Sequence, residues 1–290
     1  MTTDTSVMRR FNRSYTQRVG ALEDSFLGMG LPLGAARLMY EIGTRATTVA
    51  DLRTRLGLDS GYLSRMLRGL ERKGYVAVRP DPADRRRRTV ELTAAGRERW
   101  DDLDRRSEER AHQLLDPLTP RQRERLNEAL ATADLLVRAA TVVIEPVDPA
   151  HPAAREAVAR YFTEADERFE DGFTPPPIEE DDETLRPPHG VFLVATSAGE
   201  PVAGGGVREY AGTAEIKRMW VHPEWRGAGL GSRLLRALEA EAAALGHHVV
   251  RLDTRHVLEE AVAMYDRAGY ERIERYNDNP YATHFFQKVL

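Results

Sequence analysis

The chain has 290 residues, of which 41% are hydrophobic and 30% charged, and its formal net charge is −4. This length allows two domains that each bury a core. Because the sequence contains neither a long apolar run nor a signal-peptide pattern, we expect a cytoplasmic protein with no membrane partner. Cysteine is absent, which excludes disulfides, thiolate nucleophiles and thiolate metal sites.

The net charge conceals a difference between the two halves of the chain. Residues 1–145 hold 26 Lys and Arg against 21 Asp and Glu, whereas residues 146–290 hold 16 against 25. Within residues 49–100 the count is 13 basic to 7 acidic. Such a local excess of positive charge suits a polyanionic partner, although charged helix faces are commonly just solvated.

Residues 1–141 are predicted to be mainly helical. We expect helices over residues 6–27 and after Pro32, the second with Leu38, Met39 and Ile42 buried. Two further helices are expected at 49–56 and 60–73, joined by a turn at 57–59. The second helix of this pair has an apolar stripe and a polar face, the division typical of a DNA recognition helix. Its polar face carries Ser60, Tyr62, Ser64, Arg65 and Arg68.

After Gly74 the sequence changes to the period of strands, with YVAVRP and TVELT flanking the turn DPADRRRR. This hairpin, the helix pair before it and the LTAAG after it resemble the winged-helix regulators of the MarR family. The resemblance implies an operator DNA partner, with Arg86, two residues after Asp84, entering the minor groove. Arg85, Arg87 and Arg88 are then expected to contact phosphates. The alternative is a solvated arginine turn on a purely structural helical domain.

Two long helices are expected from Ala94 and from Pro120, the second capped by Thr119 with Gln122 as its capping-box partner. Both carry leucine stripes. The MarR resemblance implies that the first and last helices of this domain entwine with a second copy, because two-fold operators require paired recognition helices. We therefore expect a homodimer, with packing of the stripes inside one chain as the alternative.

Residues 142–290 are predicted to form a second domain that follows without a flexible linker. We expect a strand over 142–147, a helix over 153–169 and a hairpin over 191–209. The acidic segment 174–188 between them is expected to be a solvated loop, with a substrate-charge filter as the alternative. A central strand over 215–221, a helix over 232–245, the strand VVRLDT, the helix AVAMYDRAGY and final strands complete the order.

The stretch from Val221 to Ser232, VHPEWRGAGLGS, lies between the central strand and the following helix. Backbone N–H groups at such a glycine-rich helix N-terminus form a site for a pyrophosphate. The glycine spacing fits neither a dinucleotide fingerprint nor a P-loop. Instead, Arg226-x-x-Gly229-x-Gly231 and the element order of 142–290 resemble the GNAT acetyltransferases. That family often has asparagine where this chain has Leu258.

The GNAT resemblance implies an α/β fold with a mixed, mostly antiparallel central sheet, so the expected chain is a winged helix-turn-helix domain joined to a GNAT domain. It also implies acetyl-CoA as co-substrate and an amine as acceptor. The residues expected to bind acetyl-CoA are Met219 and Val221 through their main chain, and Arg226, Gly227, Gly229, Gly231 and Ser232 around the pyrophosphate.

Two side chains are expected to move protons in this reaction. The GNAT resemblance implies that Glu215, six residues before Val221, is the general base, acting through water. The alternative is a structural ion pair with Lys217, which faces the same side of the strand. Tyr265 stands where the family has a tyrosine, and the resemblance implies that it gives a proton to the thiolate; a core aromatic role is the alternative. No metal is expected, because no metal-ligand spacing is visible among the histidines.

Three functions are compatible with this sequence. The first is a bifunctional protein, a DNA-binding regulator joined to a working N-acetyltransferase. In the second, the GNAT-like domain is a sensor that binds acetyl-CoA or a metabolite without turnover. In the third, the helical half is only a dimerisation scaffold for an enzyme. The arginine turn favours DNA binding over a scaffold, and turnover would separate the first two.

Overall fold

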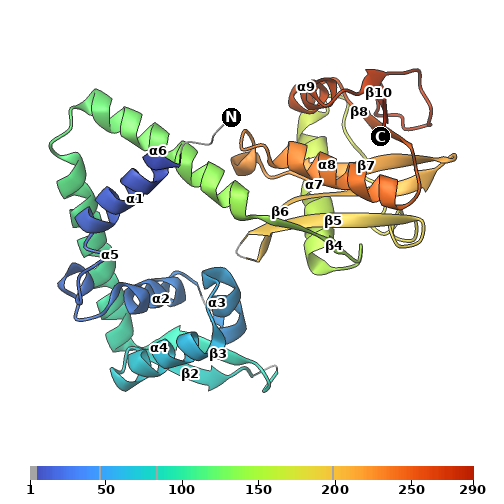
Figure 1. Cartoon of the computed structure of the whole chain (residues 1–290). Helices are drawn as coiled ribbons and strands as arrows, with labels where there is room; N and C mark the ends of the chain where they lie inside the picture. The colour runs from blue at the N-terminus through green and yellow to red at the C-terminus, as the bar shows by residue number, and fades with distance from the viewer. Residues whose placement is uncertain (1–4, 46, 83, 198) are drawn as a thin grey trace. The chain divides into compact units, whose positions relative to one another are not determined.

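The computed structural model describes residues 5–45, 47–82, 84–197 and 199–290 (Figure 1). The chain divides into two compact units, residues 1–128 and 129–290. The division falls within one helix, α6 (Pro120–Thr141), whose N-terminus carries the expected capping box between Thr119 and Gln122. The predicted domain limits at residues 141 and 142 lie at the end of this helix and stay a prediction. Within the described ranges, no helix is both long and apolar enough to span a bilayer.

The first unit packs helices against a small antiparallel sheet of order β1-β3-β2. Its elements are α1 (Ser6–Arg18), η1 (Phe26–Gly28), α2 (Leu33–Thr44), β1 (Thr47–Thr48), α3 (Val49–Leu56), α4 (Ser60–Arg72), β2 (Val76–Pro80), β3 (Arg88–Leu92) and α5 (Ala94–Leu115). The predicted core positions Leu38, Met39 and Ile42 are buried in its centre. The winged helix-turn-helix architecture is therefore confirmed.

Local signals explain most of these boundaries. Thr48 caps α3 in a reciprocal capping box with Asp51, Gly57 ends α3 in the left-handed conformation, and Asp59 caps α4. The first predicted helix is wrong at its C-terminal end. Instead of reaching residue 27, α1 stops at Arg18, and Gly20 follows with φ 74°. A left-handed glycine two residues beyond the helix redirects the chain into a turn.

The second unit contains a seven-stranded sheet of order β4-β5-β6-β7-β8-β10-β9. Its elements after α6 are β4 (Val143–Val147), α7 (Pro152–Arg168), β5 (Gly190–Ser197), β6 (Glu200–Tyr210), β7 (Thr213–Val221), η2 (Pro223–Trp225), α8 (Leu230–Ala244), β8 (Val249–Thr254), α9 (Glu259–Arg267), β9 (Glu271–Arg272) and β10 (His284–Val289). The described strands pair antiparallel except for β7 with β8. This confirms the mixed, mostly antiparallel sheet.

Helices α7 and α8 cover opposite faces of this sheet (Figure 1). Adjacent glycines of β6 show why they approach so closely. A Cβ on Gly204 would lie 3.0 Å from the Cβ of Ala157 on α7, and one on Gly205 would lie 3.2 Å from Leu238 on α8. The larger core cluster forms under α8 and the smaller one under α7. Glycines in β6 therefore let both helices pack directly on the central strands.

Candidate active site

Strands β7 and β8 stop pairing after Ile216, and this fork in the sheet defines the site. The parallel pairing of β7 with β8 runs from Ala214 to Ile216 on β7, and among the described residues no register partner on β8 is recorded for residues 217–221. The main chain at the end of β7 therefore has an edge that another extended group can pair with.

A β-bulge sits in β7 at this fork. The register against β6 shifts between Gly204 and Gly206, where Arg218 adopts φ 53°. An extra residue reverses the alternation of side chains beyond it. Met219 and Val221 consequently pack against the core under α8. The bulge is the local feature that turns these two predicted residues toward the pocket described below.

The loop after β7 forms the predicted cradle. Gly227 and Gly229 have φ values of 80° and 78°, and a Cβ at either position would meet no atom within 4 Å. Gly229 is the N-cap of α8 and supplies no side-chain cap. The helix begins at Leu230, two residues earlier than predicted, so Gly231 and Ser232 lie in its first turn. Its first N–H groups and the positive end of its dipole are thus available to an anion.

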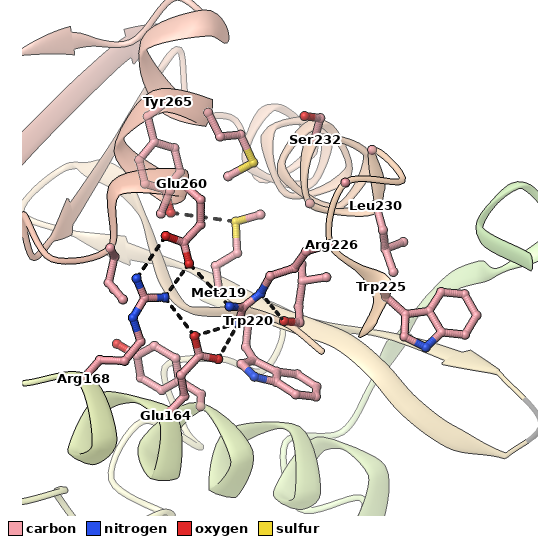
Figure 2. A pocket seen from close by; sticks show the side chains of 18 of the residues that line it. Glu164, Arg168, Met219, Trp220, Trp225, Arg226, Leu230, Ser232, Glu260 and Tyr265 are labelled. Atoms are coloured by element: carbon pink, nitrogen blue, oxygen red, sulfur yellow. Dashed lines mark hydrogen bonds and ion pairs between the residues drawn. The ribbon is translucent and has the colours of Figure 1, made fainter. Parts of the chain in front are cut away.

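The fork, the loop and α9 enclose a pocket of about 340 Å³. Figure 2 shows it from close by. It brings together one proton-transfer candidate, Tyr265, and all the residues predicted to bind acetyl-CoA: Met219, Val221, Arg226, Gly227, Gly229, Gly231 and Ser232. Leu258, the departure from the family pattern, also lines it. The predicted cofactor residues are therefore neighbours in space.

Tyr265 lies on α9 with its ring in the core and its hydroxyl directed to β7. The ring is 5.7 Å from those of Tyr270 and Phe286, and the hydroxyl donates to Met219 Sδ at 3.9 Å. Burial raises the pKa of this phenol well above its ordinary value, so the hydroxyl keeps its proton. The two roles considered for Tyr265 are compatible, because the ring packs while the hydroxyl reaches the pocket.

Glu215 lies outside the pocket lining, in a buried ionic network. Arg208 donates to its Oε2 from Nε at 2.9 Å, while Tyr276 and Asn277 each donate to Oε1 at 3.0 Å. Lys217, the partner considered from sequence, is farther away at 3.9 Å. Both carboxylate oxygens are therefore occupied, Oε2 by Arg208 and Oε1 by Tyr276 and Asn277.

The acidic segment contributes to the same network, contrary to the expectation of a solvated loop. Asp181 is buried and pairs with Arg208 at 2.7 Å and with Arg218 at 2.9 Å. Asp182 is held by Arg155 of α7. The neighbouring glutamates at 179, 180 and 183 are exposed as expected. Three arginines, from α7, β6 and β7, fold onto this segment and explain the burial; composition alone does not reveal them.

Four charged side chains form a second network at the pocket wall, and the sequence reasoning missed three of them. Figure 2 shows Glu164 and Arg168 of α7 linked to Arg226 and to Glu260 of α9. All four line the pocket. The i, i+4 spacing of Glu164 and Arg168 was readable on the predicted helix, but their partnership with Arg226 depends on the fold.

In the first unit, every predicted DNA-contact residue is exposed. Tyr62, Ser64, Arg65 and Arg68 project away from the buried Leu63, Leu67 and Leu70, and Ser60 is exposed in the first turn of α4. In the wing, Arg85, Arg86 and Arg87 are exposed as well. Asp84 Oδ1 accepts from the Arg86 amide at 3.0 Å and fixes the turn that presents these arginines.

Among the residues that the structure describes, no group of three or more His, Asp or Glu side chains is arranged to hold a metal ion.

Comparisons with known proteins agree with this geometry. Residues 155–270 match the model of the acetyltransferase (GNAT) family, and residues 29–87 match that of the MarR family. The chain is 30% identical over 126 residues to the uncharacterized N-acetyltransferase YjgM of Escherichia coli, covering 41% of this chain and 73% of that protein.

Two further relatives are similar over shorter segments. An uncharacterized N-acetyltransferase of Schizosaccharomyces pombe is 36% identical over 97 residues, or 32% of this chain and 60% of that protein. The IAA acetyltransferase of Azospirillum brasilense is 37% identical over 90 residues, or 30% and 59%. The chain thus spans about three fifths of the length of these two relatives. Through its second unit the chain belongs to the GNAT acetyltransferase family, and ahead of that unit it carries a segment that matches the MarR family model.

Proposed function

We propose that the second unit transfers an acetyl group from acetyl-CoA to an amine, and that the first unit binds an operator DNA. The observation that carries the enzymatic part is the pocket at the fork. An uncapped helix N-terminus suits the pyrophosphate, and the free edge of β7 suits the extended pantetheine arm. Two of the relatives are named N-acetyltransferases and the third an acetyltransferase, which supports the same reaction class.

The acceptor nitrogen forms a bond to the thioester carbonyl carbon and loses a proton to water, while the carbon–sulfur bond breaks and the thiolate takes up a proton. In this proposal the Val221 N–H stabilises the developing oxyanion and Tyr265 supplies the proton. A phenol that stays protonated at neutral pH suits the second role. Glu215 is the general base expected from the resemblance, but the donors on both its oxygens favour a structural ion pair with Arg208.

The enzymatic part is tested by measuring thiol release from acetyl-CoA across a panel of amines that includes amino acids, polyamines, aromatic amines and lysine peptides. We expect release that depends on one amine class and that is lost when Gly229 is replaced by a bulky residue. Binding of acetyl-CoA without thiol release for any amine would instead support the sensor function.

The DNA-binding part rests on the exposed polar face of α4 and on the arginine wing. Operators with two-fold symmetry require two copies, and helix α1 has an apolar face suited to one, with Met8, Phe11 and Tyr15 exposed. We propose a homodimer through this helix and the helices that close the unit. Titration of random-sequence and selected DNA over a range of salt concentrations tests binding, and sedimentation tests the dimer.

One observation favours the sensor as a second candidate function, alone or beside catalysis. The end of α6 and the residue after it are attached to α8, the helix that follows the glycine loop: Arg233 of α8 donates to the carbonyl oxygens of Ala139 and, at 2.8 Å, of Val142. Arg138 stacks over Trp225 at 4.8 Å. Because α6 starts in the first unit, acetyl-CoA bound at the loop could bias this helix.

The sensor function predicts that acetyl-CoA changes the DNA affinity of the unaltered chain. It also predicts that Arg233→Met, which removes the two bonds to the end of α6, abolishes this change while DNA binding itself persists. Equal DNA affinity with and without saturating acetyl-CoA contradicts the sensor and leaves the enzyme.

A further inference from the structure

We propose that Arg168 is a second phosphate-binding arginine of the acyl-CoA site and that Glu260 is its displaceable counter-ion. This inference rests on the proposed use of acyl-CoA and adds to it a residue outside the glycine loop. It concerns the second network of the pocket wall, formed by Glu164, Arg168, Arg226 and Glu260.

The two arginines share the same two carboxylates. Glu164 Oε1 accepts from Arg168 Nη1 at 3.1 Å and from Arg226 Nη2 at 2.6 Å. Glu260 accepts from Arg226 Nη1 at 3.4 Å and from Arg168 Nη2 at 3.0 Å. The guanidinium groups are therefore held side by side at the pocket wall, as Figure 2 shows. An anion that reaches Arg226 also comes within reach of Arg168.

The charge of the wall depends on Arg168. With two arginines and two glutamates the network is formally neutral. Without Arg168 it would carry one net negative charge beside the site proposed for a polyanion. Such a charge opposes phosphate binding in a partly buried wall, where screening is weak. Arg168 is thus required both to neutralise the wall and to offer donors.

The network also indicates which carboxylate a bound phosphate displaces from the arginines. The side chain of Glu260 is 49% exposed, against 18% for Glu164. Water can take the place of the arginines at Glu260 at lower cost than at Glu164, so a phosphate can replace Glu260. The hydrogen bond from Arg168 lowers the pKa of Glu260, which keeps this carboxylate charged as a counter-ion at neutral pH.

A main-chain bond holds Arg168 in position while its counter-ion is exchanged. Nη2 of Arg168 donates to the carbonyl oxygen of Val257 at 2.7 Å. This contact ties the last turn of α7 to the segment before α9. The guanidinium therefore stays at the wall when Glu260 moves away, which preorganises it for a phosphate.

The test is a titration of the full chain with acetyl-CoA, monitored by calorimetry, for the unaltered protein and three variants. Arg168→Met keeps the stem and removes the charge, and we expect about 10–100-fold weaker binding, the size of a lost charge-assisted hydrogen bond. Glu260→Gln removes the competing counter-ion, and we expect about 3–10-fold tighter binding. Arg186→Met is the matched control, because its side chain is 30% exposed against 27% for Arg168, is also ion-paired, and lies outside the pocket lining.

A second ligand distinguishes the source of the phosphate. Dephospho-CoA lacks the 3′-phosphate, so a loss in Arg168→Met that disappears with this ligand assigns Arg168 to the 3′-phosphate. A loss that persists assigns it to the pyrophosphate. Either result supports the inference.

Unchanged acetyl-CoA affinity in Arg168→Met, with Arg186→Met also unchanged, overturns the inference while the proposed function stands. Weaker binding in Glu260→Gln overturns it too, because the four side chains would then act only as a structural clamp. Absence of acetyl-CoA binding by the unaltered chain overturns both the inference and the proposed function.

Discussion

Replacing Glu215 by glutamine separates the two roles considered for this residue. Glutamine keeps the shape of the side chain but removes the charge that Arg208 pairs with. Removing one partner of a buried ion pair costs about 3–5 kcal/mol. Arg208 keeps Asp181 at 2.7 Å, so we expect the lower end, about 3 kcal/mol. In a unit of this size, that free energy lowers the melting temperature by about 6–12 °C.

Differential scanning calorimetry measures this shift directly. Glu209→Gln is the matched control, because that side chain is 53% exposed and its recorded charged partner, His189, lies 3.9 Å away; we expect its melting temperature to stay within about 2 °C. A Glu215→Gln protein as stable as the unaltered chain would refute the structural reasoning. If that protein also turned over about 10²–10⁴-fold more slowly and partly recovered at high pH, Glu215 would be established as the general base.

Four further predictions test other parts of the account. Gly229→Val weakens acetyl-CoA binding by about 10–100-fold in a titration without unfolding the second unit. The valine side chain occupies the space of the phosphate, and the backbone angle there, φ 78°, favours glycine. Tyr265→Phe lowers turnover by about 10²–10⁴-fold with no recovery at high pH, since it removes a proton donor; recovery in a pH–rate profile contradicts this role. Arg86→Ala flattens the salt dependence of DNA binding by about one unit in log–log titrations, and an unaltered slope contradicts a contact of Arg86 with the minor groove or the backbone. Phe11→Glu produces monomers in sedimentation, whereas a persisting dimer moves the interface elsewhere.

Much of the fold followed from local sequence signals. The Thr119 capping box, the turn at 57–59 and the change of period after Gly74 each predicted a boundary that the structure confirms. The glycine loop could also be predicted, because a strand, positive-φ glycines and a helix N-terminus are consecutive in the chain. These signals share one property, since the interacting residues lie within a few positions of each other.

The parts that sequence reasoning missed depend on contacts between distant segments. Nothing near Asp181 indicates that Arg208 and Arg218 fold onto it, so an acidic run resembled a solvated loop. For the same reason, Arg208 was not recognised as the main partner of Glu215, although Lys217 was considered from the alternation of the strand. The bulge at Arg218 was equally invisible, because a non-glycine residue gives no sign of a positive φ.

Hydrogen-exchange mass spectrometry with saturating acetyl-CoA tests the central claim that the fork and the glycine loop form one acyl-CoA site. Bound acetyl-CoA should slow exchange of the amides at 227–233, where the N-terminus of α8 binds the pyrophosphate, and at 219–221, where β7 pairs with the pantetheine arm. Gly229→Val should lose this protection at the same ligand concentration. Binding of acetyl-CoA that leaves both segments exchanging at the rates of the free protein would contradict the account.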